Sequence, residues 1–184
     1  MNEEITDEQI IKQVLLGDKN AFGGLINRFE NKLSRYIRRF IYDENEAGDL
    51  LQNVFIKAYT NLNSFNFNYK FSPWIYRITH NEIVNYIKKK QKTKIVFDID
   101  WDTIVPIKDN GNFGEEIDKD NLEKWLAKSL KEIPYKYKEV LTLYYFEGLA
   151  YKEISEVLLI PSSTVGIRIK RAKELLKKLY NKKP

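Results

Sequence analysis

The stretch that decides the fold is residues 150–173, AYKEISEVLLIPSSTVGIRIKRAK. Apolar residues at helical spacing mark its first part: Ile154, Val157 and Leu158. Pro161 ends that helix, because proline lacks an N–H and disfavours helical backbone in the residue before it. Ser162 or Ser163 can then cap a second helix by accepting a backbone N–H bond. The stretch therefore predicts two short helices joined by a tight turn.

The second predicted helix is strongly two-faced. At about 100° per residue, one stripe of it is apolar, formed by Val165, Ile169, Ala172, Leu176 and Leu179. The remaining surface carries Ser163, Gly166, Ile167, Lys170, Lys173 and Lys177, with Arg168 and Arg171 flanking the stripe. This is the layout of a helix-turn-helix recognition element. The alternative is an ordinary helical hairpin with a solvated cationic face.

The composition limits the class of protein. A chain of 184 residues allows one domain or two small ones, and its charge of +5 makes a polyanionic partner plausible. Cysteine is absent from the sequence, which removes disulfides and thiolate metal sites. The acidic start, residues 1–8, predicts no signal peptide, and no apolar run reaches the ~20 residues of a membrane helix. Frequent apolar spacings of three and four favour an all-α fold.

The charge is unevenly distributed along the chain. Residues 88–94 hold five lysines in seven positions. Residues 94–121 carry three lysines against eight acids, a net charge of −5, and residues 162–184 carry eight basic residues against one glutamate, a net charge of +7. This pattern predicts two polyanion-binding modules joined by an acidic linker.

The N-terminal half predicts a helical bundle. A capped first helix follows Thr6 and ends at Gly17, and further helices are expected over 21–40, 46–62 and 74–90. In the C-terminal half, helices are expected over 121–132 and 135–146, with Gly148 ending the second of them.

An aromatic loop separates the third and fourth helices. Residues 63–74 have the Asn, Ser and Pro of a loop but hold five aromatics: Phe65, Phe67, Tyr69, Phe71 and Trp74. We expect Phe65, Phe71 and Trp74 to pack under the bundle, which leaves Phe67 and Tyr69 exposed. Exposed rings beside Asn side chains can stack on an unpaired base, a contact worth about 1–3 kcal/mol per base.

The sequence lacks the residue clusters of an enzyme. His80 is the single histidine and has no cysteine or histidine partner for a metal, so we expect it at the surface or in contact with a base. No nucleophile–base pair or phosphate-cradling glycine loop is present. We expect no catalytic residues, no metal and no cofactor.

Two helical modules, the second ending in this hairpin, resemble the sigma factors of bacterial RNA polymerase. The resemblance is to the two-domain extracytoplasmic-function (ECF) group, covers about residues 8–93 and 118–180, and rests on three motifs. The first, GDLLQNVFIKAY at 48–59, is similar to the helix by which the family grips the polymerase clamp. The resemblance implies polymerase-binding roles for Asp49, Gln52, Asn53, Phe55 and Ile56.

The second motif runs from Phe65 through FSPWIYRITHN at 71–81 and is similar to the reader of the minus-ten promoter element. In the family this loop and helix extrude one non-template base into a pocket. The resemblance implies that the minus-ten contacts come from Phe65, Asn66, Phe67, Asn68, Tyr69, Arg77, His80, Asn81, Lys88 and Lys89. The lysines suit single-strand phosphates, a salt-sensitive contact.

The third motif is the hairpin, which resembles the reader of the minus-thirty-five element. The positions implied are Ser162, Ser163, Thr164, Ile167, Arg168, Lys170 and Arg171, and a major groove suits such residues. Three departures stand out. Leu159 occupies the place of a turn glycine. A left-handed leucine costs roughly 1–2 kcal/mol, so we expect this turn either to differ locally or to be strained. Gly166 and Ile167 replace Lys and Ser, and Ala150 replaces a capping Ser or Thr.

The sequence thus predicts two small helical bundles joined by an acidic linker, the second ending in a helix-turn-helix. The boundaries expected are 1–93, 94–119 and 120–184. The implied function is promoter-specific transcription initiation in the cytoplasm, with core RNA polymerase, duplex promoter DNA and the melted non-template strand as partners. An anti-sigma factor is a further partner allowed by the family, and membrane insertion is not expected. The alternative is a freestanding helix-turn-helix transcriptional regulator, which would leave residues 8–93 without a role.

Overall fold

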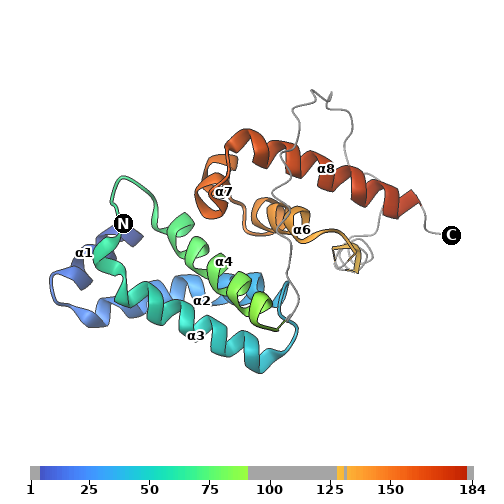
Figure 1. Cartoon of the computed structure of the whole chain (residues 1–184). Coiled ribbons are helices and arrows are strands. Elements are labelled where there is room, and N and C mark those ends of the chain that lie inside the picture. The colour runs from blue at the N-terminus through green and yellow to red at the C-terminus, as the bar shows by residue number, and fades with distance from the viewer. Residues whose placement is uncertain (1–4, 91–127, 131, 182–184) are drawn as a thin grey trace.

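The computed structural model describes residues 5–90, 128–130 and 132–181, and every regular element within those ranges is helical (Figure 1). The expected all-α fold is therefore confirmed. The predicted acidic linker, 94–119, and most of the predicted helix at 121–132 lie outside the described residues. In the part of the chain that is described, none of the helices is both long and apolar enough to cross a membrane.

The N-terminal bundle opens with two helices. Helix α1 (Asp7–Leu15) has a capping box, in which the Gln9 N–H donates to Thr6 Oγ1 and the Thr6 N–H donates to Gln9 Oε1. A 3₁₀ turn, η1 (Lys19–Ala21), then leads into α2 (Phe22–Arg38). Arg28 of α2 pairs with Asp7 at 2.7 Å, which ties the two helices together.

Helix α3 (Glu44–Thr60) starts two residues before its predicted position because Asp43 caps it. Asp43 Oδ1 accepts the N–H groups of Asn45 and Glu46. A short turn, η2 (Leu62–Ser64), precedes the aromatic loop.

Helix α4 (Phe71–Lys90) begins three residues before the predicted start at 74. The Phe71 N–H donates to Glu8 Oε1 over 3.1 Å, so a carboxylate from α1 satisfies one of the orphan donors of the first turn. Pro73 lies inside that first turn, where its missing N–H has no intrahelical acceptor.

The C-terminal bundle contains one departure from regular helix. Residues 135–146, predicted as a single α-helix, form α6 (Tyr135–Leu141) followed by a π-helical turn, η3 (Thr142–Phe146). The Glu147 N–H donates to the Thr142 carbonyl five residues back. Gly148, with φ +69°, ends the segment as predicted.

The hairpin has the predicted layout, with α7 (Tyr151–Leu158) joined by a tight turn to α8 (Ser162–Asn181). The expected serine cap is wrong. Helix α8 begins at Ser162 itself, and the Val165 N–H donates to the carbonyl of Pro161, so proline occupies the capping position. The predicted apolar stripe is buried at Val165, Ile169, Ala172 and Leu176.

Buried apolar side chains of both bundles form one continuous cluster, which runs from Ile10 and Leu33 through Ile75 and Ile83 to Ile154 and Ile169. A smaller cluster lies between α6 and α8 and includes Leu141, Ala172 and Leu176. Figure 1 shows α4 between the other helices of the N-terminal bundle and the pair α6 and α7. The fourth helix therefore has packing partners on two sides.

Candidate functional site

The aromatic loop has a buried base and exposed rings. Phe65 is only 5% exposed and packs edge-on against Phe67, Phe71 and Trp74, with ring centroids 5.2–5.9 Å apart. Phe67 and Tyr69 are 42% and 53% exposed. The predicted division between packed and exposed rings is confirmed. Phe65 is buried and packs beneath Phe67, and its contact with a base stays a prediction.

The asparagines of the loop shape its turn. The Asn68 N–H donates to Asn66 Oδ1 at 2.9 Å, and the Tyr69 N–H donates to the Asn66 carbonyl at 3.0 Å. Asn66 thus uses its side-chain acceptor within the loop. The Lys12 Nζ lies 5.6 Å from the centroid of the Phe67 ring, so α1 adds a positive charge beside the exposed aromatics.

Helix α4 presents most of its predicted minus-ten residues to solvent. Arg77 and Asn81 lie one turn apart on the exposed face, and Lys88 and Lys89 are exposed near its end. Arg77 and Asn81 are four residues apart, so they lie on one side of the helix that follows the aromatic loop. Such a surface can stack on bases, donate hydrogen bonds to their edges and neutralise phosphates.

His80 departs from the expectation of a surface residue. Its side chain is 16% exposed, and its Nδ1 lies 2.5 Å from Glu139 Oε1 of α6. The sequence separation of 59 residues explains why no local pattern indicated this pair. In this conformation His80 contacts a carboxylate of the C-terminal bundle rather than solvent.

The polar residues of the predicted clamp helix face outward. Asp49, Gln52 and Asn53 are exposed on α3, and Ile56 is 53% exposed. Phe55 is buried at the base of a groove of about 570 Å³ between α2 and α3. The predicted polymerase-binding residues therefore form a polar ridge beside an apolar recess.

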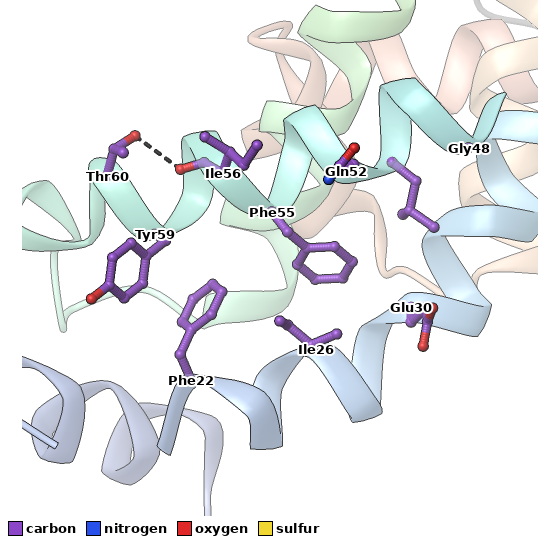
Figure 2. A pocket seen from close by; sticks show the side chains of 10 residues that line it. Phe22, Ile26, Glu30, Gly48, Gln52, Phe55, Ile56, Tyr59 and Thr60 are labelled. Carbon is purple, nitrogen blue, oxygen red and sulfur yellow. Dashed lines mark hydrogen bonds between the residues drawn. The ribbon is translucent and has the colours of Figure 1, made fainter. Parts of the chain in front are cut away.

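Figure 2 shows the two walls of this recess, which we call the α2–α3 groove. Phe22 and Ile26 rise from α2 toward Phe55 and Tyr59 of α3, and Glu30 lies at one end. Phe22 and Ile26 have the helical spacing of core residues in the helix predicted over 21–40, so a recess beside Tyr59 was not expected. The signal available was the spacing of four residues between Phe55 and Tyr59, which places both rings on one side of α3.

The turn of the hairpin contains the expected strain. Leu159 has φ 54° and ψ 41°, the left-handed conformation that glycine adopts without cost. One contact spans this turn, in which the Ser155 hydroxyl donates to the Ile160 carbonyl at 2.6 Å. At the other end of α7, Glu153 Oε2 accepts the Ala150 N–H at 2.9 Å. The missing cap at Ala150 is therefore replaced in part by the carboxylate of Glu153.

The predicted minus-thirty-five residues lie outside the buried stripe of α8, with Arg168 at its edge. Ser162 and Ser163 are exposed, and the others are half-buried: Thr164, Ile167, Arg168, Lys170 and Arg171. Gly166 lies in the same stretch, and a Cβ there would meet the Tyr151 ring at 3.5 Å, an ordinary contact distance. The predicted outward position of Ile167 is only partly realised, since it is half-buried.

Among residues 5–90, 128–130 and 132–181, no group of three His, Cys, Asp or Glu side chains is arranged to hold a metal ion. The polar groups of the site belong instead to two reading helices and one groove.

Comparison with known proteins places these features in sequence families. The model of sigma-70 region 2 matches residues 25–93, and that of sigma-70 region 4 matches residues 123–176. The chain is 32% identical over 182 residues to the ECF RNA polymerase sigma-E factor of Haemophilus influenzae, with 96% of each chain covered. It is 33% identical over 186 residues to the ECF RNA polymerase sigma factor SigW of Bacillus subtilis, with 95% of this chain and 97% of SigW covered.

Two solved structures share the fold. CnrH, solved in complex with the cytosolic domain of CnrY, has a TM-score of 0.72 at 24% identity, with 97% of this chain and 99% of CnrH covered. The sigma factor RpoE of Bartonella quintana, solved with the anti-sigma factor NepR, has a TM-score of 0.65 at 20% identity, with 89% of this chain and 98% of RpoE covered. At these identities the likeness establishes the fold.

Proposed function

The chain belongs to the ECF sigma factors of bacterial RNA polymerase, and from that premise we propose how its parts divide the work. It binds core RNA polymerase and promoter DNA and directs promoter-specific transcription initiation. We assign polymerase binding and minus-ten reading to residues 1–93, connection to residues 94–119, and minus-thirty-five reading to residues 120–184. The observation that carries the proposal is the order of two matched regions, each containing one predicted reading helix.

Polymerase binding is assigned to α3 and the α2–α3 groove. The polar ridge of Asp49, Gln52 and Asn53 can orient a partner helix, while Ile56 and the recess above Phe55 accept an apolar side chain from it. Interfaces of this kind bury a central apolar contact within a polar rim.

Minus-ten reading is assigned to the aromatic loop and the exposed face of α4. Phe67 and Tyr69 offer ring faces to an unpaired base, and Asn81 can bond its edge. Arg77, Lys88 and Lys89 supply positive charge for the strand's phosphates, which gives a salt-dependent and sequence-blind contribution.

Minus-thirty-five reading is assigned to α8 in the major groove. Arg168, Lys170 and Arg171 are the residues suited to guanine edges or phosphates, and Ile167 suits a thymine methyl group. Ser162, Ser163 and Thr164 lie at the start of the helix, where hydroxyls and backbone N–H groups can hold phosphates.

The proposed work is done by binding energy, in the cytoplasm where the polymerase acts, and we propose no catalytic step by this chain. An anti-sigma factor is proposed as a regulatory partner. The exposed rings of Phe67 and Tyr69 give such a partner an apolar surface to cover.

In vitro transcription tests the proposal. Core polymerase, the purified chain and a promoter library are combined, and the start sites are sequenced. Asn81→Ala is expected to relax discrimination at one base of the minus-ten element, by about 1–3 kcal/mol. Lys170→Ala is expected to weaken use of the minus-thirty-five element. Parental initiation by both variants would show that the residue assignments are wrong.

The groove assignment has its own matched pair of variants. Ile56→Ser removes an exposed apolar side chain at the α2–α3 groove, and Leu16→Ser removes one that is 89% exposed at the end of α1. We expect Ile56→Ser to lower the affinity for core polymerase and Leu16→Ser to leave it unchanged, measured by fluorescence anisotropy. Equal affinities would remove the groove from the interface.

A gel shift with the purified chain alone separates this function from a freestanding regulator. A regulator binds its duplex tightly without help, whereas a sigma factor depends on core polymerase for promoter binding. The sequence families favour the second outcome.

A further inference from the structure

Helix α1 is fixed beside the aromatic loop by two of its acidic residues. Asp7 pairs with Arg28 of α2 at 2.7 Å, and Glu8 Oε1 accepts the Phe71 N–H at 3.1 Å. Phe71 is the residue at which the aromatic loop ends and α4 begins. Helix α1 also contacts η2, the turn that precedes the loop. Helix α1 is therefore in contact with the chain on both sides of the aromatic loop.

The face of α1 that holds the end of the loop also carries a lysine. Lys12 follows Glu8 by four residues, so the two side chains lie on the same side of the helix. Lys12 Nζ lies over the Phe67 ring, 5.6 Å from its centroid. Glu8 and Lys12 thus contact the end and the middle of the same loop. We call these two residues the α1 wall.

Phe67 is the aromatic residue that the α1 wall contacts. The Phe65 ring meets it edge-on at an interplanar angle of 77°, and 42% of Phe67 stays exposed. The neighbouring backbone is held by Asn66, whose Oδ1 accepts the Asn68 N–H at 2.9 Å. The ring is therefore positioned by the protein before a ligand arrives, which reduces the entropy cost of binding.

The Lys12 ammonium is available for an anion. Lys12 is exposed, and within the part of the chain that is described no carboxylate forms an ion pair with it. A cation over an exposed aromatic ring is held only weakly. The ammonium also stands on a flexible four-carbon stem and has three donors. It can therefore leave the ring for a stronger acceptor without breaking another contact of the fold.

A base stacked on Phe67 would bring such an acceptor. Each base of a single strand is joined through its sugar to phosphates on both sides, so stacking carries negative charge to the rim of the ring. The base takes the ring face, and the ammonium turns to the adjacent phosphate. A hydrogen bond between an ammonium and a phosphate is charge-assisted and stronger than the contact that it replaces.

We propose that the α1 wall completes the minus-ten site and that Lys12 is a further residue that contacts the melted strand. Lys12 orients the Phe67 ring in the free chain and pairs with a phosphate next to the base stacked on that ring. This inference rests on the proposed function, because it takes the aromatic loop to be the place where an unpaired base binds. It extends the site from the loop and α4 to a helix near the start of the chain.

Strand binding by the holoenzyme tests the proposal. The probe is a fluorescent single strand that carries the non-template minus-ten region of the strongest promoter recovered from the library transcription experiment. Its anisotropy is measured with holoenzyme over a series of salt concentrations. Lys12→Gln removes the charge and keeps most of the side chain. Lys178→Gln removes the same charge from an exposed position near the end of α8 and is the matched control.

We expect Lys12→Gln to lower the affinity by about three- to tenfold and to reduce the slope of log K against log salt by about 0.7, the value for one single-strand phosphate. Lys178→Gln should change neither, and Lys12→Arg, which keeps the charge, should bind like the parent. Parental affinity in Lys12→Gln would overturn the proposal. A loss of affinity with an unchanged salt slope would overturn the phosphate contact, because support of the ring alone does not alter the slope.

A double-mutant cycle with Phe67→Ala tests whether Lys12 and the ring act together. If they share one nucleotide, Lys12→Gln should cost at least about twofold less in the Phe67→Ala background than in the parent. Equal losses in the two backgrounds would show that Lys12 acts apart from the ring, against the proposal. Both side chains are exposed, so the circular dichroism of all four proteins should be the same.

The outcome for the parental holoenzyme separates this inference from the proposed function. A parental holoenzyme that fails to bind the strand would count against minus-ten reading by the aromatic loop. Binding by the parent together with parental binding by Lys12→Gln would remove only the α1 wall from the site.

Discussion

The two predicted reading helices differ in how many neighbours they have. Helix α8 packs through one stripe onto α6 and α7, and its opposite side is exposed or half-buried. Helix α4 packs on α2 and α3 with one side and on α7 with another. Tyr76 of α4 is only 2% exposed, and its hydroxyl donates a hydrogen bond to Glu147 of the C-terminal bundle. The comparison shows that one side of α8 is available to a partner, whereas α4 is packed between the first bundle and the second.

The largest expected effect comes from a substitution on the buried side of α4. Phe71→Ala removes a fully buried ring that packs on Phe29 and Trp74, so it should lower the free energy of unfolding by about 3–5 kcal/mol. Phe67→Ala, which removes an exposed ring of the same loop, should cost under about 1 kcal/mol. Urea denaturation followed by circular dichroism measures both. Equal losses of stability in the two variants would mean that the buried Phe71 ring contributes no more to stability than the exposed Phe67 ring.

The second prediction sharpens the shared side of α4 through pH. Burial raises the pKa of Glu147, while the Tyr76 hydrogen bond and the nearby charges of Arg39, Arg35 and Lys32 oppose the rise. The folded chain therefore binds this proton more tightly than the unfolded chain. The contribution of Glu147 to stability is fully present below the ordinary pKa of a glutamate and is lost as pH rises through the raised pKa.

The free energy of unfolding should accordingly fall as the pH rises from below the ordinary pKa of a glutamate through the raised pKa of Glu147, which urea denaturation at a series of pH values measures. Glu147→Gln is the matched control, because it keeps the shape of the side chain and cannot titrate. The pH response should be smaller in that variant. An identical response in both proteins would assign the effect to another titratable group.

The third prediction concerns α8 and its turn. Leu159→Gly removes a left-handed leucine that is 67% exposed, so little packing is lost. The relief of about 1–2 kcal/mol is reduced by the entropy of glycine, about 0.5–1 kcal/mol, and the net gain should be about 1 kcal/mol. Thermal unfolding should shift upward by about 2–4 °C. Leu16→Gly, at a position with φ −81°, serves as control and should not raise the midpoint.

The smallest expected effect lies inside α8. Gly166→Ala should raise the free energy of unfolding by up to about 1 kcal/mol, because alanine favours a helix interior and the added Cβ has room beside Tyr151. Chemical denaturation measures the gain. If stability falls instead, the Tyr151 ring has no freedom to accommodate the methyl group.

The accuracy of the sequence predictions follows the same contrast. The apolar stripe of α8 and the strain at Leu159 could be predicted, because both depend on neighbours in the chain. The start of α4 could not be predicted, because the acceptor for the Phe71 N–H comes from Glu8 of α1. Likewise the pairing of His80 with Glu139 joins residues 59 positions apart. Local periodicity does not predict such long-range contacts. A polar residue whose partner is distant in the sequence is therefore assigned to the surface.

The candidate site divides in the same way. The exposed rings Phe67 and Tyr69 were expected from an aromatic loop that contains too many rings to be wholly solvated. The recess between α2 and α3 was not expected. Ile26 follows the ordinary spacing of a core residue, and only the packing of the two helices leaves a gap above it. The linker expected at 94–119 and the assignments to individual bases stay predictions.

The docking of the two bundles depends on the number of residues in the π-helical turn at Thr142–Phe146. A π turn holds one residue more than the α-helical turn it replaces, and one residue rotates everything downstream by about 100° about the helix axis. Removing a single residue there would restore a regular helix while pointing Glu147 away from Tyr76. A one-codon deletion would thus change both the pairing of Glu147 with Tyr76 and the packing of α6 on α8.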